Sequence, residues 1–166
     1  MLVNHSGLKE FNEFDDLYSA NLCQIYNHLN QFKIHCYSIN DYQNLDDAIP
    51  LDGFENDSFG FAIDNKDGKF SSTSAYIVFS QEICQNLQLS SEEIYACIAH
   101  EVGHIVHYFN KALEGVDSLL IERKADEIAK ILGISNLLSE VLSKLINSGL
   151  CSEEQCACMN YRKKYL

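Results

Sequence analysis

The spacing of apolar residues changes along the chain, from helical near the start to strand-like in the middle. Apolar side chains recur at helical spacing from Leu8 to Leu29, which predicts an amphipathic helix over residues 7–31. A shorter helix is expected near residues 42–48. Three apolar runs are typical of strands, at residues 33–39, 59–63 and 75–79. Turn residues at 64–68 favour a hairpin between the last two runs.

Helical spacing returns in the second half of the chain. Helices are expected at residues 80–87, 91–110 and 118–132, and two more within residues 135–160, one over 135–147 and a short one from Cys151 onward. Ser90 with Glu93 three residues later is typical of a capping box at the start of the second of these helices. Gly133 is expected to end the third. The pattern predicts one α+β domain over residues 1–166, in which a small antiparallel or mixed sheet within 33–79 packs on a central helix and precedes a helical C-terminal half.

Charge narrows the classes of partner. Twelve Lys and Arg residues stand against 24 Asp and Glu, a formal net charge of -12. Such a field repels phosphate backbones and anionic lipid surfaces, so we expect neither nucleic acid nor a membrane as partner. The N-terminal residues lack the features of a secretory signal, and no apolar run is long enough for a transmembrane helix. Seven cysteines, an odd number, fit a reducing compartment, so we expect a cytoplasmic protein.

Residues 100–104, His-Glu-Val-Gly-His, carry the candidate chemistry. Positions four apart lie on one helix face, so His100 and His104 can reach one zinc ion, and Glu101 can hold a zinc-bound water as general base. The alternative is a helix with two buried histidines and a surface glutamate. Apolar neighbours on most sides of this helix favour the metal site, because buried polar groups without partners are costly.

A third ligand is expected downstream. Glu122 and Asp126 share a helix face, so Glu122 could complete the site while Asp126 accepts the outer N–H of a ligand histidine. A solvated charged face is the alternative for both. Glu114 and Asp117 are weaker candidates, because they fall in a predicted loop. His107 is expected to be a core or supporting histidine, since three ligands from one straight helix fit a tetrahedral ion poorly.

These residues resemble those of the gluzincin metallopeptidases. The likeness is closest to the branch of the CAAX prenyl proteases and their small soluble relatives, the minigluzincins. In that branch a Glu-x-x-Ala-Asp segment follows the His-Glu-x-x-His helix, as residues 122–126 follow 100–104 here. The resemblance covers roughly residues 59–147. Regulatory proteases that cut phage-type repressors share the plan.

The resemblance implies a zincin-like fold and a set of roles. It implies one Zn²⁺ ion held by His100, His104 and Glu122, with Glu101 as general base and Asp126 as a supporting residue. It also implies that a substrate peptide adds a strand to an edge strand at residues 75–79. No residue here matches the family's oxyanion-stabilising His or Tyr.

Three functions follow as hypotheses. The first is zinc-dependent hydrolysis of a peptide or protein substrate, with an endopeptidase favoured over an exopeptidase. The second is a latent or regulatory form, in which a C-terminal thiolate from Cys151, Cys156 or Cys158 closes the open metal position. The third is a zinc-stabilised interaction module. The presence of Glu101 argues against the third, because binding alone needs no base there.

Overall fold

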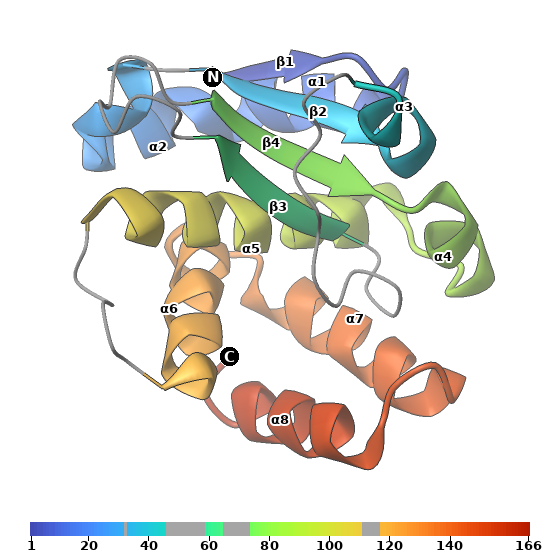
Figure 1. Cartoon of the computed structure of the whole chain (residues 1–166). Coiled ribbons are helices and arrows are strands. Elements are labelled where there is room, and N and C mark those ends of the chain that lie inside the picture. The colour runs from blue at the N-terminus through green and yellow to red at the C-terminus, as the bar shows by residue number, and fades with distance from the viewer. Residues whose placement is uncertain (32, 46–58, 65–73, 111–116) are drawn as a thin grey trace. The chain divides into compact units, whose positions relative to one another are not determined.

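The computed structural model describes residues 1–31, 33–45, 59–64, 74–110 and 117–166 (Figure 1). This part of the chain is α+β, as the sequence predicts. It divides into two compact units, residues 1–81 and 82–166. One domain over residues 1–166 stays a prediction.

The first unit begins with a helical region that is more broken than the predicted single helix over 7–31. It consists of α1 (Lys9–Phe14), a π-helical turn (Asp15–Ser19), α2 (Ala20–Ile25) and a 3-10 helix (Asn27–Gln31). In the π-helical turn the Asp15 carboxylate accepts hydrogen bonds from the Leu2 backbone N–H, at 2.8 Å, and from the Ser19 hydroxyl. α2 ends where Tyr26 leaves helical backbone angles, at φ -119° and ψ 77°. Apolar spacing alone shows neither change.

A four-stranded mixed sheet forms the rest of the first unit. Its strands are β1 (Leu2–Asn4), β2 (Ile34–Ser38), β3 (Phe59–Asp64) and β4 (Ser74–Phe79), in the order β1-β2-β4-β3. β1, β2 and β4 are parallel, and β3 pairs antiparallel with β4. The predicted pairing of the last two strands is confirmed, while the turn expected at 64–68 extends beyond the described residues. β1 lies outside the predicted segment of residues 33–79. The sequence did not predict it, because a three-residue strand gives no periodic signal.

The position of β4 corrects one expectation. β4 pairs with β2 on one side and with β3 on the other, so residues 75–79 do not form an edge strand (Figure 1). Among the described strands, the ends of the sheet are β1 and β3. A near-continuous apolar run is typical of a central strand, whose two neighbours satisfy its backbone groups.

The two faces of this sheet are covered differently. One face presents buried side chains from β2 and β4, namely Ile34, Cys36, Ala75, Ile77 and Phe79. The ring of Phe11 in α1 contacts it, with centroids 5.9 Å from Phe79 and 6.1 Å from Phe59. The opposite face packs against α3 (Ile39–Gln43), where Tyr42 contacts Val78. α3 starts three residues before the predicted 42–48 helix, whose last part lies outside the described residues.

The second unit is helical. Its helices are α4 (Gln81–Asn86), α5 (Ser91–Asn110), α6 (Ser118–Ile131), α7 (Ser135–Ser148) and α8 (Glu153–Lys163). The predicted capping box is present. Ser90 N–H donates to Glu93 Oε2 at 2.7 Å, and Glu93 N–H donates to Ser90 Oγ at 3.2 Å. Gly133 follows α6 with φ +74°, which confirms its predicted role as helix stop. In the described chain no helix is both long and apolar enough to span a membrane.

Candidate metal centre

Two neighbouring helices of the second unit carry every predicted site residue. His100, Glu101 and His104 lie in the middle of α5, and all three are buried. Glu122 and Asp126 lie in α6, one turn apart. Asp117 directly precedes α6, and its side chain accepts the Leu119 N–H at 2.8 Å. Asp117 therefore caps a helix, which gives it a structural role instead of the weaker ligand role considered from sequence.

Gly103 brings these two helices close together. A Cβ atom built on Gly103 would lie 2.7 Å from Ala125 Cα and still closer to the carbonyl oxygen of Ala125. Any larger residue at 103 would push α6 away from α5. Glycine lies beside His104 and faces the small Ala125, so the local sequence sets the spacing between His100 on one helix and Glu122 on the other.

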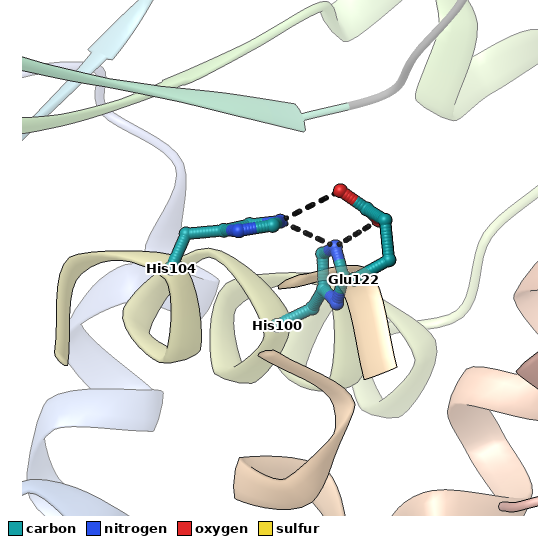
Figure 2. Close-up of side chains that lie close together, drawn as sticks. All are labelled: His100, His104 and Glu122. Carbon is teal, nitrogen blue, oxygen red and sulfur yellow. Dashed lines mark hydrogen bonds and ion pairs between the residues drawn. The ribbon is translucent and has the colours of Figure 1, made fainter. Parts of the chain in front are cut away.

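Three side chains converge at this contact. Figure 2 shows His100 and His104 from α5 turned toward Glu122 from α6. The two Nε2 atoms are 3.0 Å apart. His100 Nε2 lies 3.3 Å from Glu122 Oε2, and His104 Nε2 lies 3.3 Å from Glu122 Oε1. Within the described residues this is the one group of three or more metal-ligating side chains. The structure thus brings together the three residues expected as ligands.

The separations suit a small divalent ion. Ligand atoms at about 2.0–2.1 Å from a tetrahedral zinc are roughly 3.3 Å from each other. The three distances of 3.0, 3.3 and 3.3 Å are close to that value. Two imidazoles and one carboxylate also form the donor set that zinc prefers in sites with an open fourth position. The residues present therefore fit the expected ion.

Asp126 occupies the supporting position expected from sequence. His100 Nδ1 lies 2.8 Å from Asp126 Oδ1, and the Asp126 side chain is only 4% exposed. A carboxylate accepts, so Nδ1 of His100 carries a proton in this contact and donates it. That hydrogen bond fixes the ring and directs Nε2 toward His104 and Glu122.

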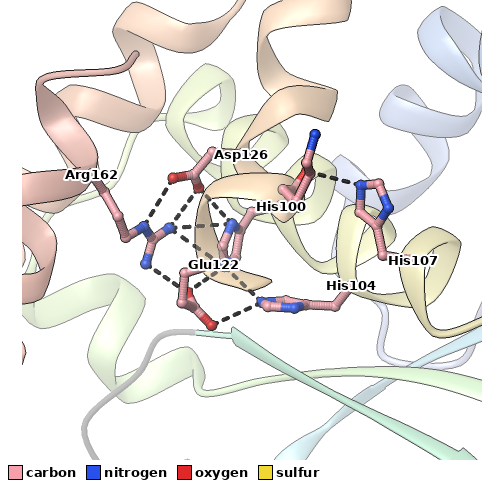
Figure 3. Close-up of polar contacts among 7 residues, drawn as sticks. His100, His104, His107, Glu122, Asp126 and Arg162 are labelled. Carbon is pink, nitrogen blue, oxygen red and sulfur yellow. Dashed lines mark hydrogen bonds and ion pairs between the residues drawn. The ribbon is translucent and has the colours of Figure 1, made fainter. Parts of the chain in front are cut away.

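Arg162 is the site residue that sequence reasoning missed. It reaches the cluster from the last turn of α8, and its side chain is 8% exposed (Figure 3). Its guanidinium donates to both oxygens of Asp126 and to Glu122. A local signal for α8 did exist, because Ser152 and Gln155 form a capping box at its start. Nothing local indicates that residue 162 meets Glu122, 40 positions earlier.

The charges of the cluster are strongly coupled. Burial and the Arg162 charge act to lower the pKa of His100, but hydrogen bonds to Asp126 and Glu122 outweigh them and raise it to about 10. Burial and the nearby His100 charge lower the pKa of His104. His100 Nε2–H can therefore donate to the unprotonated Nε2 of His104.

The carboxylates respond in opposite ways. Burial acts to raise the pKa of Glu122, but its contacts with both histidines outweigh burial and hold the pKa far below its usual range. Burial likewise acts to raise the pKa of Asp126, but hydrogen bonds from His100 and Arg162 lower it to about 2. Glu101 differs, since burial and then the Glu122 charge raise its pKa to about 7. Glu122 and Asp126 are thus ionised at neutral pH, while Glu101 can exchange a proton near neutrality.

The other candidates lie outside the cluster. His107 Nε2 donates to the backbone carbonyl of Lys124 at 3.0 Å, so it links α5 to α6, consistent with a supporting histidine (Figure 3). Glu114 lies outside the described residues. No cysteine belongs to the metal-ligating group of the described chain. Burial raises the pKa of the Cys158 thiol, which disfavours the thiolate needed for the latent form.

Comparison of the chain with protein-family models, with curated proteins and with solved structures found no match. The relation to gluzincins stays a prediction that rests on residues 100–104 and 122–126.

Proposed function

We propose that this protein is a zinc-dependent metallopeptidase with a zincin-like active site. The observation that carries the proposal is the convergence of His100, His104 and Glu122, with their contacting atoms 3.0–3.3 Å apart. Two imidazoles and a carboxylate are a donor set that suits zinc, and among the described residues no other group of this kind occurs. The Glu122 side chain is 31% exposed, so water can reach the cluster.

His100, His104 and Glu122 would hold the ion. A zinc ion bound there supplies Lewis acidity, which polarises a peptide carbonyl and lowers the pKa of a water molecule. Asp126 accepts from Nδ1 of His100, so the imidazole would bind the ion through Nε2 once that nitrogen has given up its proton. With three side chains holding the ion, such a site would also accept a substrate oxygen or a water molecule.

Glu101 would move the proton. It follows His100 directly on α5, so its carboxylate starts from the same turn of helix as the ligand imidazole. A carboxylate in that position can accept a proton from the attacking water and deliver it to the leaving amine. A general base must take up and release a proton. Glu122 and Asp126 are held in ion pairs with Arg162, so neither can do this.

The substrate would be an extended peptide. A peptide that adds a strand to the sheet needs a free edge, and among the described strands β1 and β3 lie at the ends of the sheet order. β4, the strand expected from sequence, has both edges paired. The proposal therefore does not include substrate pairing along residues 75–79.

The test is a peptide-library cleavage assay with metal analysis on the same samples. Glu101→Gln should lower cleavage by about 100- to 10,000-fold, the range for loss of a general base. The same variant should retain one equivalent of zinc. Glu92→Gln is the matched control, because Glu92 is an exposed carboxylate at the start of the same helix. Its cleavage rate should equal that of the wild type.

Two other outcomes would replace the proposal. Stoichiometric zinc without cleavage in the wild type would favour the latent protein or the interaction module. Absence of zinc from the wild type, even after incubation with excess metal, would overturn the metal site itself.

A further inference from the structure

The strongest unassigned feature of the second unit is Arg162. Its guanidinium donates three hydrogen bonds that span two carboxylates one helical turn apart. Nε donates to Asp126 Oδ2 at 2.9 Å and Nη2 to Asp126 Oδ1 at 2.6 Å. Nη1 donates to Glu122 Oε2 at 2.8 Å (Figure 3). The side chain is 8% exposed, so this is a buried ion-pair network and not a surface contact.

We infer that Arg162 is a positioning residue, which holds Glu122 and Asp126 in the geometry that a metal ion requires. The inference rests on the proposed zinc site. It assigns to α8, the last helix of the chain, a direct effect on how tightly the ion is held.

The two oxygens of each carboxylate have different hydrogen-bond partners. Asp126 Oδ1 accepts both from Arg162 Nη2 and from His100 Nδ1, while Oδ2 accepts from Arg162 Nε. Both oxygens of the Asp126 carboxylate are thus held in place, so the group cannot rotate and Oδ1 stays directed at His100 Nδ1. In Glu122 the guanidinium holds Oε2, and Oε1 faces His104 Nε2 at 3.3 Å. Arg162 therefore limits rotation of the carboxylate that would bind the ion.

The planar guanidinium suits this task better than an ammonium group. Its N–H bonds point in fixed directions, so one guanidinium can bind Asp126 through two parallel hydrogen bonds and still reach Glu122. A lysine at 162 would offer a single point charge on a flexible stem. Charge alone would then be retained while the two-carboxylate geometry would be lost.

The positive charge of Arg162 would also repel a cation bound nearby. Arg162 Nη2 lies 3.2 Å from His100 Nδ1, so the guanidinium touches the ring of a proposed ligand. Repulsion would make removal of Arg162 tighten zinc binding. Asp126 offsets that charge through its paired hydrogen bonds. Without Arg162, the buried Asp126 would be driven toward water and away from His100. We expect the loss of geometry to outweigh the relief of repulsion.

Zinc affinity of three purified variants tests the inference. Competition with a chromogenic chelator should show zinc binding weakened about 10- to 100-fold in Arg162→Gln, the usual effect of losing a partner of the ligands. Arg162→Lys should fall between this variant and the wild type. Lys163→Gln is the matched control, because Lys163 lies on the same turn of α8 and donates instead to Ser143 Oγ at 2.6 Å. Its affinity should not change.

Cobalt substitution gives a second readout, which a purely structural role would not move. The visible absorption bands of Co²⁺ report ligand number and geometry, so they should shift in Arg162→Lys while Lys163→Gln matches the wild type. Arg162→Lys also keeps the experiment informative if Arg162→Gln fails to fold by circular dichroism.

The outcomes separate this inference from the proposed function. If the wild type binds zinc and Arg162→Gln binds it equally or more tightly, the positioning role is overturned and the metal site stands. Unchanged affinity and cobalt bands in Arg162→Lys would overturn the role as well. If the wild type binds no zinc, both ideas are overturned.

Discussion

Two pairs of histidines in this protein look alike by distance and differ in everything else. His100 and His104 on α5 have ring nitrogens 3.0 Å apart. His5, just after β1, and His35, in β2, have ring nitrogens 2.9 Å apart. The first pair is buried, whereas His5 is exposed and stacks on Tyr37 with centroids 4.5 Å apart.

Carboxylates make the difference between the pairs. The α5 pair has Glu122 3.3 Å from both imidazoles, and Asp126 fixes the outer nitrogen of His100. The sheet pair belongs to no group of three metal-ligating residues in the described chain. Two imidazoles in contact therefore do not define a metal site. The α5 pair is a candidate metal site because a second helix places a carboxylate beside it, which the close packing at Gly103 allows.

The largest effect should come from removing one imidazole of each pair. His104→Asn should weaken zinc binding by more than the roughly 100-fold upper range for supporting partners, since a ligand itself is lost. His35→Asn should leave zinc binding unchanged. Both affinities are measured by chelator competition on folded protein. Equal losses in the two variants would break the comparison, because the sheet pair would then contribute to binding.

Gly103→Ala should have the next largest effect, through the spacing of α5 and α6. Overpacking a core costs about 1–3 kcal/mol. Alanine gains roughly 1 kcal/mol over glycine in a helix interior, which opposes that cost. We expect a net loss of stability in urea unfolding and weaker zinc binding. Ala125→Gly should not rescue the variant, because the clash is with the Ala125 backbone. A net gain in stability would show that the helices separate without cost.

The sequence predicted the parts of this site that are local. His100 and His104 are one turn apart, and Glu122 lies one turn from Asp126, so periodicity alone places each pair on a face. The contact of Arg162 with the cluster could not be predicted in this way, because no periodicity links α8 to α6. The contact depends on how α8 packs after α7, which is a tertiary property.

The fold shows the same division between local and distant information. The capping box at Ser90 and the helix stop at Gly133 are local, and both were predicted correctly. The order of strands is not local. β4 was expected at an edge, yet its pairing with β2 joins segments about 40 residues apart. β1 is three residues long and pairs with β2, about 30 residues further along the chain, so no local pattern reveals it.

A partly buried ion pair outside the candidate site gives a comparison for the buried charges of the cluster. Glu93 is buried, and Lys144 from α7 donates to its Oε2 at 2.7 Å. Glu93→Gln keeps an oxygen that can accept the Ser90 N–H but loses the charge that pairs with Lys144, so it should cost about 1 kcal/mol or less at pH 7. It should not change zinc binding. Glu92→Gln serves as the exposed control on the same helix.

The cost should depend on pH. Burial acts to raise the pKa of Glu93, but Lys144 and the Ser90 N–H outweigh it and lower the pKa. A lowered pKa means that the stabilisation is complete above the unfolded value, about 4.3, and is lost as pH falls through the lower folded value. The gap between wild type and Glu93→Gln in urea unfolding should therefore narrow below about pH 4. A gap that widened there would contradict the ion pair.

The smallest effect belongs to the sheet pair, where a change in charge should alter stability slightly and zinc binding not at all. Burial lowers the pKa of His35, and the charges of His5 and Lys33 act in the same direction. The folded protein thus favours neutral His35, and this contribution is present above the unfolded pKa of about 6.5 and is lost as pH falls through the lower folded value. His35→Gln should remove a dependence of only about a few tenths of a kcal/mol, because His35 is only partly buried and water screens the charges near it. Urea unfolding of both proteins between about pH 7.5 and 5.5 measures it. A wild type that gained stability over the variant on acidification would mean that the pair binds a proton in the folded state, as His100 does beside its carboxylates.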